Sequence, residues 1–171
     1  MPRNIEIKAC IESVDSLLPR VSVIADSGLT ELFQEDTFFH CPNGRLKLRV
    51  FSDRDGQLIF YKSPDNAGPK ESFYIISPAT SPHTLCETLS LAYGQSGKVS
   101  KNRTLFLVGH TRVHLDRVEG LGHFLELEVV LSENESSDEG VAIAHGLLSR
   151  LGISHEQLIE GAYVDLSPKR P

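Results

Sequence analysis

The chain has 171 residues, of which 40% are hydrophobic and 23% are charged. These values are typical of a globular protein, so we expect one domain over residues 1–171 and exclude a mostly disordered chain. The net charge of −6, with the seven histidines counted as neutral, argues against a nucleic-acid or membrane-surface partner, because proteins of those classes usually carry a basic surface.

Two different patterns follow each other at the N-terminus. Residues 3–11 alternate strictly between apolar and polar side chains, which is the period of a β-strand, and Glu6 and Lys8 lie on its polar face. Residues 13–27 place apolar side chains at helical spacing, and Gly28 is expected to end this helix. We therefore predict a strand followed by a helix.

Four strands with short connections are expected in the next stretch. The strands are predicted at residues 32–39, 45–51, 57–62 and 70–76. Their connections are the turns at residues 41–44 and 53–56 and the loop at residues 63–69. The first turn contains Asn43-Gly44, a strong hairpin signal, so we expect neighbouring strands to run antiparallel.

The second half of the chain begins with a helix that starts at Pro82 and ends at Gly94. Three further strands are predicted at residues 98–108, 111–116 and 123–131. Residues 132–139 are acidic and rich in serine, which indicates a solvated loop. The last elements are expected to be a helix at residues 141–151, a short helix at 154–160 and an extended segment at 161–165.

Together these elements predict an α+β fold. The eight or nine strands are joined mostly by hairpins, which favours one antiparallel sheet. Closure of such a sheet removes its exposed edges. We therefore predict a closed eight-stranded antiparallel β-barrel with the helices packed on its outside.

The polar faces of these strands carry charges that are segregated by sign. Residues 45–49 present three cations at alternate positions, and Glu126 and Glu128 share one face of the last strand. Like charges at this spacing repel one another, so a stable sheet needs a reason to keep them. One interpretation is that the charged faces are simply solvated, as in many antiparallel sheets. If helices cover the apolar face instead, the charged face points into the barrel.

A charged lumen would have direct chemical consequences. Buried charges are costly unless they are paired, so the cationic faces imply an anionic ligand and the carboxylates imply bound cations. Glu6, Glu126 and Glu128 offer the oxygen ligands that Mg²⁺ or Mn²⁺ prefers beside a phosphate. The second interpretation therefore predicts a lumen that binds a polyanion together with divalent cations.

These residues resemble the CYTH family, which includes class IV adenylyl cyclases, thiamine triphosphatases and other triphosphate tunnel metalloenzymes. Residues 4–8 are similar to the family's N-terminal Glu-x-Glu-x-Lys signature, and residues 44–49 are similar to its basic strand. The segment at residues 106–130 resembles the cyclase-like branch, and Glu126 and Glu128 match the closing Glu-x-Glu of the family. The resemblance covers nearly the whole chain.

The resemblance implies a role for each matching residue. The implied metal ligands are Glu6, Glu126 and Glu128. The implied phosphate-binding residues are Lys8, Lys47, Arg49, Lys62, Arg103 and Arg112. The implied catalytic residues are Glu6, Lys62 and Asp116, the last as a metal ligand or a group that orients water. Tyr163 matches a residue near the tunnel mouth of the family, and it joins the substrate-binding set with Arg45, expected at the mouth, and Lys101, expected either in the lumen or at its rim.

Two positions depart from the family pattern. Asn4 stands where the signature has its first Glu, which removes one negative charge and bears on metal affinity or stoichiometry. Phe38 and Phe39 stand where some triphosphatase relatives carry tyrosine, so Lys62 lacks an evident tyrosine partner for proton transfer. Activation of water is therefore expected to come from metal and carboxylate.

The resemblance implies a metal-dependent enzyme that acts on a nucleoside, thiamine or inorganic triphosphate. Hydrolysis of the terminal phosphate is favoured, because it demands little positioning of a nucleoside. Two alternatives stay open: an adenylyl cyclase that converts ATP to cAMP and pyrophosphate, and a non-catalytic module that binds triphosphate or polyphosphate. The expected partner is a small-molecule triphosphate, and a homodimer is left open because the sequence does not fix the oligomeric state.

The cysteines and the N-terminus indicate the compartment. Cys10, Cys41 and Cys86 are odd in number and include no Cys-x-x-Cys pair, which indicates free thiols in a reducing environment. The first residues are too polar for a signal peptide, and no run of about 18 apolar residues occurs. We therefore expect a cytoplasmic protein.

Overall fold

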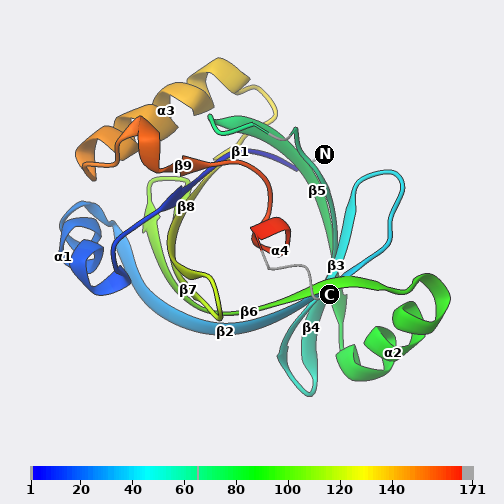
Figure 1. The fold of residues 1–171 in the computed structure, drawn as a ribbon. Coiled ribbons are helices and arrows are strands. Elements are labelled where there is room, and N and C mark those ends of the chain that lie inside the picture. The colour runs from blue at the N-terminus through cyan, green and yellow to red at the C-terminus, as the bar shows by residue number, and fades with distance from the viewer. Residues whose placement is uncertain (1, 65, 167–171) are drawn as a thin grey trace.

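The computed structural model describes residues 2–64 and 66–166, and its strands close into a ring (Figure 1). In chain order the elements are β1 (Arg3–Cys10), α1 (Val14–Ile24), β2 (Ser27–Phe39), β3 (Arg45–Ser52), β4 (Asp55–Lys62), β5 (Lys70–Ala79), α2 (Pro82–Tyr93), β6 (Gln95–Val108), β7 (Thr111–Val118), β8 (Gly122–Leu131), α3 (Ser137–Arg150), the 3-10 helix η1 (His155–Gln157), β9 (Leu158–Ile159) and α4 (Tyr163–Leu166). The strand order is β5-β4-β3-β2-β6-β7-β8-β1, and β1 also pairs with β5. All pairings between the described strands are antiparallel, which confirms the predicted eight-stranded barrel.

The register of the ring aligns the polar faces of neighbouring strands. Glu126 of β8 lies opposite Lys8 of β1 on one side and opposite His114 of β7 on the other. Glu128 lies opposite Glu6 of β1. Residues opposite each other in an antiparallel pair share one face of the sheet, so these polar side chains gather on one surface.

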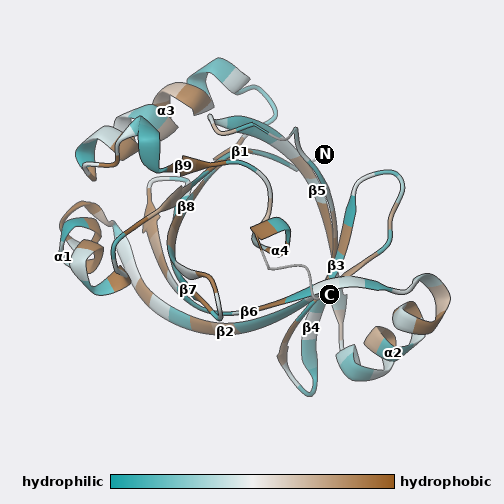
Figure 2. Cartoon of the chain, in the orientation of Figure 1, coloured by the Kyte–Doolittle hydropathy of each residue, from teal (hydrophilic) through white to brown (hydrophobic). Residues whose placement is uncertain are grey.

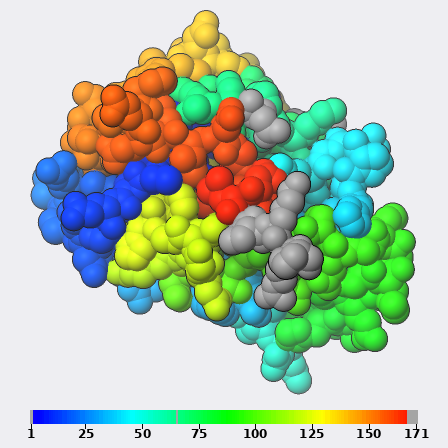
Figure 3. All heavy atoms as spheres, in the orientation of Figure 1, coloured from blue at the N-terminus to red at the C-terminus, as the bar shows by residue number. Residues whose placement is uncertain are grey.

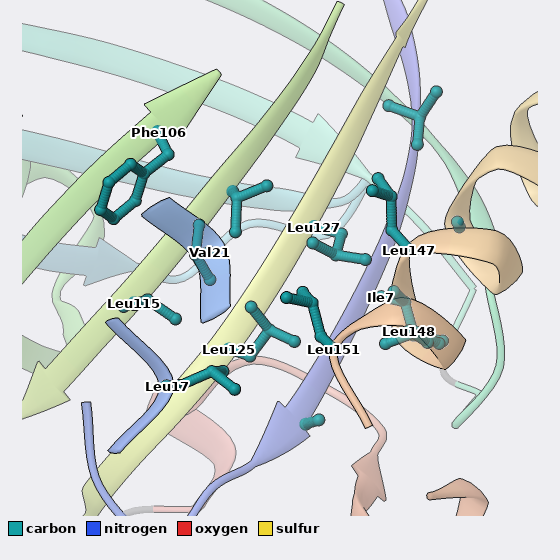
Figure 4. Packing of buried hydrophobic residues seen from close by; sticks show 14 of the residues in the cluster. Ile7, Leu17, Val21, Phe106, Leu115, Leu125, Leu127, Leu147, Leu148 and Leu151 are labelled. Atoms are coloured by element: carbon teal, nitrogen blue, oxygen red, sulfur yellow. The ribbon is translucent and has the colours of Figure 1, made fainter. Parts of the chain in front are cut away.

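The apolar faces of the same strands point outward and are covered by α1 and α3 (Figures 1 and 4). The buried residues labelled in Figure 4 are Ile7, Leu17, Val21, Phe106, Leu115, Leu125, Leu127, Leu147, Leu148 and Leu151. Burial of each such side chain contributes about 1.5–3 kcal/mol relative to exposure, so this outer layer supplies much of the stability of the fold. Figure 2 shows the alternation of hydrophilic and hydrophobic residues along the strands.

Helix α1 begins as predicted but ends earlier. The side chain of Ser13 caps it by accepting a hydrogen bond from the backbone of the first turn. The helix ends at Ile24 rather than at Gly28, because the chain from Ser27 onward pairs with β6 as the first part of β2. A Cβ at Gly28 would lie 2.7 Å from Cδ1 of Phe106, so glycine permits this close contact between strands.

Helix α3 begins four residues earlier than predicted, at Ser137. Ser136 and Glu139 form a reciprocal capping box, so Asp138 and Glu139 belong to the first helical turn and not to a loop. Their negative charges favour the positive end of the helix dipole. The last residues of the acidic, serine-rich segment therefore begin a helix, where a solvated loop was predicted.

The C-terminal elements also differ from the prediction. Residues 154–160 form only the short helix η1 and the two-residue strand β9, which pairs with β1 beyond the point where β5 leaves it. The extended segment predicted at residues 161–165 is wrong, because Tyr163–Leu166 form the single helical turn α4 inside the ring (Figure 1). A Cβ at Gly97 of β6 would collide with Cγ2 of Val164, so α4 packs closely on a glycine.

Among the described residues, no helix combines the length and apolar character required to cross a membrane. Cys10, Cys41 and Cys86 are free thiols, and none of them is fully buried.

The contact between α3 and the ring makes two glycines of that helix unequal. A Cβ at Gly140 would lie 2.6 Å from Cγ1 of Ile5 and 2.7 Å from Cδ2 of Leu131, whereas one at Gly146 would meet no described atom within 4 Å. We expect Gly146→Ala to raise the free energy of unfolding by about 0.5–1 kcal/mol, since alanine is the better helix former. We expect Gly140→Ala to lower it by about 1–2 kcal/mol, because overpacking outweighs that gain. Urea denaturation measures both values, and equal stabilisation by the two variants would contradict the packing described.

Candidate functional site

The inner face of the ring encloses a cavity of about 500 Å³. Side chains from all eight ring strands and from α4 line it. The charged lining residues are Glu6, Lys8, Asp36, Arg45, Lys47, Arg49, Lys70, Lys101, Arg103, Arg112, Glu126 and Glu128. Eight of them are Lys or Arg and four are carboxylates, so the cavity is cationic within a chain whose net charge is −6.

Helix α4 covers one end of this cavity, and in Figure 3 its atoms fill the middle of the face that Figure 1 views. The Tyr163 hydroxyl donates a hydrogen bond to Oδ2 of Asp116 at 2.7 Å. The ammonium of Lys8 lies 4.1 Å from the centre of the Tyr163 ring, a cation–π distance. Arg45 and Asp165 form an ion pair of 2.5 Å at the same end. These contacts make α4 one wall of the cavity.

Most residues predicted for the site from the sequence do line the cavity. They are Glu6, Lys8, Arg45, Lys47, Arg49, Lys101, Arg103, Arg112, Glu126, Glu128 and Tyr163. Lys101, which was expected either in the lumen or at the rim, is only 4% exposed and lies in the lumen. Arg112 is exposed although it also borders the cavity.

Lys62 is placed differently from the prediction. Its neighbours Tyr61 and Ser63 line the cavity, whereas Lys62 is exposed on the other face of β4. The reason is the alternation of the strand, which sends adjacent side chains to opposite faces. Lys70, the first residue of β5, is the cation that reaches the lumen from this part of the ring. Lys62 is therefore not among the residues that line the cavity.

Asp116 is fully buried, and its oxygens are already engaged. Arg103 donates to both of them from Nε and Nη2, each at 2.8 Å, and Tyr163 donates to Oδ2. Burial alone would raise the pKa of Asp116, but Arg103 holds it well below its usual range. These hydrogen bonds fix the orientations of Arg103 and Tyr163, and the role of Asp116 as a metal or water ligand stays a prediction.

A second buried carboxylate, Asp36, was missed by the sequence analysis. Arg49 donates to both of its oxygens at 2.9 Å, and the ammonium groups of Lys47 and Lys101 lie 3.5 and 3.7 Å from Oδ2. Burial alone would raise the pKa of Asp36, but the three cations hold it well below its usual range. Gln34 and Asp36 are polar residues at alternate positions of β2 and both line the cavity, so this alternation was the sequence signal that could have identified Asp36.

Two carboxylates of β8 and one imidazole of β7 meet at another part of the lumen wall. Ligand atoms of His114, Glu126 and Glu128 all lie within 4.8 Å of one another. Burial raises the pKa of Glu128, and the adjacent Glu126 raises it further. Burial would also raise the pKa of Glu126, but Lys8, His114 and Arg103 hold it well below its usual range. Glu6 lines the same cavity but is not a member of this three-residue group.

Three buried polar atoms bear on whether a metal ion fits here. His114 Nδ1, Asn4 Oδ1 and Gln34 Oε1 have no hydrogen-bond partner among the described residues, although each side chain belongs to the cavity wall. Such atoms are costly to bury unless a ligand, ion or water satisfies them. His114 Nδ1 lies beside the carboxylates of Glu126 and Glu128, and a nitrogen donor with two carboxylates is a ligand set that fits a divalent cation.

Known proteins share both sequence and fold with this chain. The model of the CYTH domain family matches residues 2–163. The chain is 26% identical over 168 residues to the adenylate cyclase CyaB of Aeromonas hydrophila, which covers 94% of this chain and 86% of that protein. Its fold is similar to that of a Pyrococcus horikoshii protein, with a TM-score of 0.84 at 23% identity over 95% of this chain and 98% of the other. It is also similar to that of a Hippeastrum protein described as having a dominant triphosphatase activity, with a TM-score of 0.66 at 16% identity over 97% and 93% of the two chains.

The ammonium of Lys47 should make anion binding depend on pH. Burial, assisted by Arg49 and opposed by Asp36, lowers the pKa of Lys47 to about 8. The protonated amine attracts an anion, so affinity for tripolyphosphate should be highest below that pKa and should fall as the pH rises through it, with proton uptake on binding. Titration calorimetry from about pH 7 to about pH 9.5 measures this fall.

The matched variant for this measurement is Lys47→Arg. A guanidinium stays protonated over the whole range, so the fall in affinity should become markedly shallower in the variant. The same pH dependence in both proteins would show that Lys47 is not the titrating contact.

Proposed function

The chain belongs to the CYTH domain family, and we propose that it is a divalent-metal-dependent enzyme that hydrolyses the terminal phosphate of a triphosphate held inside the ring. The observation that carries this proposal is one cavity that combines a cationic wall with a carboxylate–imidazole group. A nucleoside, thiamine or inorganic triphosphate has the matching chemistry, because its anionic oxygens bind both basic side chains and a metal ion.

The cationic wall consists of side chains whose positions are already fixed. Its members are Lys47 and Arg49 of β3 and Lys101 and Arg103 of β6. Asp36 and Asp116 each hold one guanidinium by two hydrogen bonds. Enzymatic phosphoryl transfer depends mainly on positioning and on stabilisation of charge, so donors held in place before the substrate arrives are suited to it.

The acidic side of the cavity would hold the metal, Mg²⁺ or Mn²⁺, through Glu126 and Glu128 with Glu6 nearby. When bound, the ion would neutralise charge on phosphate oxygens and acidify a water molecule. Burial and Glu126 raise the pKa of Glu6, which leaves this carboxylate as the group we assign to accept the proton of the attacking water. Asn4, in place of a fourth carboxylate, lowers the negative charge of this side.

Cyclisation of ATP to cAMP and pyrophosphate is the second candidate, favoured by the likeness to the Aeromonas adenylate cyclase. Both reactions would use the same cationic wall. Hydrolysis requires water in line with the terminal phosphorus, whereas cyclisation requires the ribose 3′-hydroxyl in line with the α-phosphorus. Hydrolysis is placed first because it needs no additional contacts that orient a ribose.

The products of incubation distinguish these reactions. Purified protein is incubated with Mg²⁺ or Mn²⁺ and, separately, with ATP, thiamine triphosphate and tripolyphosphate, and phosphate, pyrophosphate and cAMP are separated and quantified. Metal-dependent release of phosphate is the expected result. Formation of cAMP with pyrophosphate would instead establish cyclisation, and tight binding without any product would establish a non-catalytic module.

The carboxylate assigned to the metal gives a specific prediction. We expect Glu126→Gln to lower turnover by about a hundredfold or more, because it removes a charged metal ligand while keeping the size of the side chain. Glu133→Gln, on the exposed loop after β8, is the control and should leave turnover unchanged. Undiminished turnover in Glu126→Gln, with folding checked by circular dichroism, would contradict the metal assignment.

A further inference from the structure

The imidazole of His114 lies in the cavity beside the carboxylates of Glu126 and Glu128. This side chain is 3% exposed, projects from β7 into the cavity, and has its Nδ1 buried without a hydrogen-bond partner among the described residues. We propose that His114 Nδ1 is a nitrogen ligand of the divalent cation, and that this mixed ligand set makes the cavity bind Mn²⁺ in preference to Mg²⁺. The proposal deepens the proposed function and depends on it for the presence of the metal.

The distances around Nδ1 are the first argument. It lies 3.6 Å from Oε1 of Glu126 and 3.7 Å from Oε1 of Glu128. Both separations exceed the range of about 2.7–3.2 Å for a hydrogen bond to oxygen. Two donors that each lie about 2.1 Å from one ion are separated by about 3–4 Å, so a cation shared by the three groups accounts for the spacing.

The alternative is that His114 is a structural residue of the wall. A structural histidine at this depth is expected to use its ring nitrogens in hydrogen bonds, because an unsatisfied buried nitrogen is costly. Nδ1 makes none among the described residues, and it is directed at two carboxylates rather than at an apolar neighbour. A cation shared by all three groups would account for both facts.

The chemistry of the ligand set is the second argument. Carboxylates suit Mg²⁺, Ca²⁺ and Mn²⁺, whereas imidazole favours the transition metals. Mn²⁺ accepts both kinds of ligand, while Mg²⁺ binds reluctantly to nitrogen and keeps its water. The loss of a carboxylate at Asn4 works in the same direction, because it weakens the purely electrostatic attraction on which Mg²⁺ depends.

Electron spin echo spectroscopy of bound Mn²⁺ tests the proposal without using activity. The wild-type protein is loaded with Mn²⁺ alone and, separately, with Mn²⁺ and tripolyphosphate. We expect modulation from a directly bonded ¹⁴N nucleus, replaced by the ¹⁵N pattern when the protein is labelled with ¹⁵N-histidine. Absence of nitrogen modulation from both samples would overturn the proposal, and this result does not depend on any variant that fails to fold.

Two variants assign the nitrogen and the preference. His114→Gln should abolish the modulation and should weaken Mn²⁺ binding by about tenfold or more in calorimetry, with a smaller loss for Mg²⁺. His155→Gln, at an exposed position in η1, should change neither. Nitrogen modulation that survives in His114→Gln, or Mg²⁺ binding as tight as that of Mn²⁺ in the wild type, would overturn the proposal.

Failure of this inference is distinguishable from failure of the proposed function. Phosphate release from a protein whose Mn²⁺ shows no nitrogen coupling would leave the triphosphatase proposal intact and remove His114 from the metal site. Nitrogen-bound Mn²⁺ in a protein that forms no product would support His114 as a metal ligand and would contradict the triphosphatase proposal.

Discussion

Charge that is enclosed by protein must be balanced by opposite charge, and this requirement connects the fold to the site. The apolar faces of the strands pack outward beneath α1 and α3, so the charged faces can only point into the ring. Asp36 and Asp116 balance part of the cationic wall, each by holding one guanidinium. The lining still contains more Lys and Arg than carboxylates. We propose that an anionic ligand supplies the remaining negative charge and binds where the strands already place the cations.

The same requirement explains why the two sides of the lumen are unlike. Cations cluster on β3 and β6, where a buried carboxylate on β2 or β7 holds them in position. Carboxylates cluster on β8, where Lys8 and Arg103 lie within 3.5 and 3.8 Å of Glu126. A phosphate chain with a bound metal has this polarity, because its oxygens face basic groups while its metal faces acidic ones. This polarity supports the proposal that the cation-rich and acid-rich parts of the lumen form one binding site.

Alternation in the sequence was sufficient to predict the ring and most of its lining wherever one face of a strand is apolar and the other is charged. Residues 4–11 and 45–51 have that pattern, and the charged residues of the polar face, Glu6, Lys8, Arg45, Lys47 and Arg49, line the cavity. The strand before Lys62 does not, because Ile59 and Tyr61 face the lumen while Phe60 faces outward. Because both faces of this strand carry apolar residues, the sequence did not show which face points into the lumen, and Lys62 was assigned to the wrong face. The contacts of Asp36 with Arg49 and of His114 with Glu126 depend on the register between neighbouring strands, which alternation within one strand does not determine. The four residues of α4 are too few to show a helical period.

The position of a triphosphate in the ring tests the central claim most directly. A crystal structure of the protein with imidotriphosphate, an analogue that resists hydrolysis, would locate its phosphorus atoms. The expected result is density inside the ring, with phosphate oxygens within hydrogen-bonding distance of Arg49, Lys101 and Arg103. A triphosphate bound on the outer surface, with the lumen filled by water alone, would contradict the claim that the charged faces enclose a polyanion.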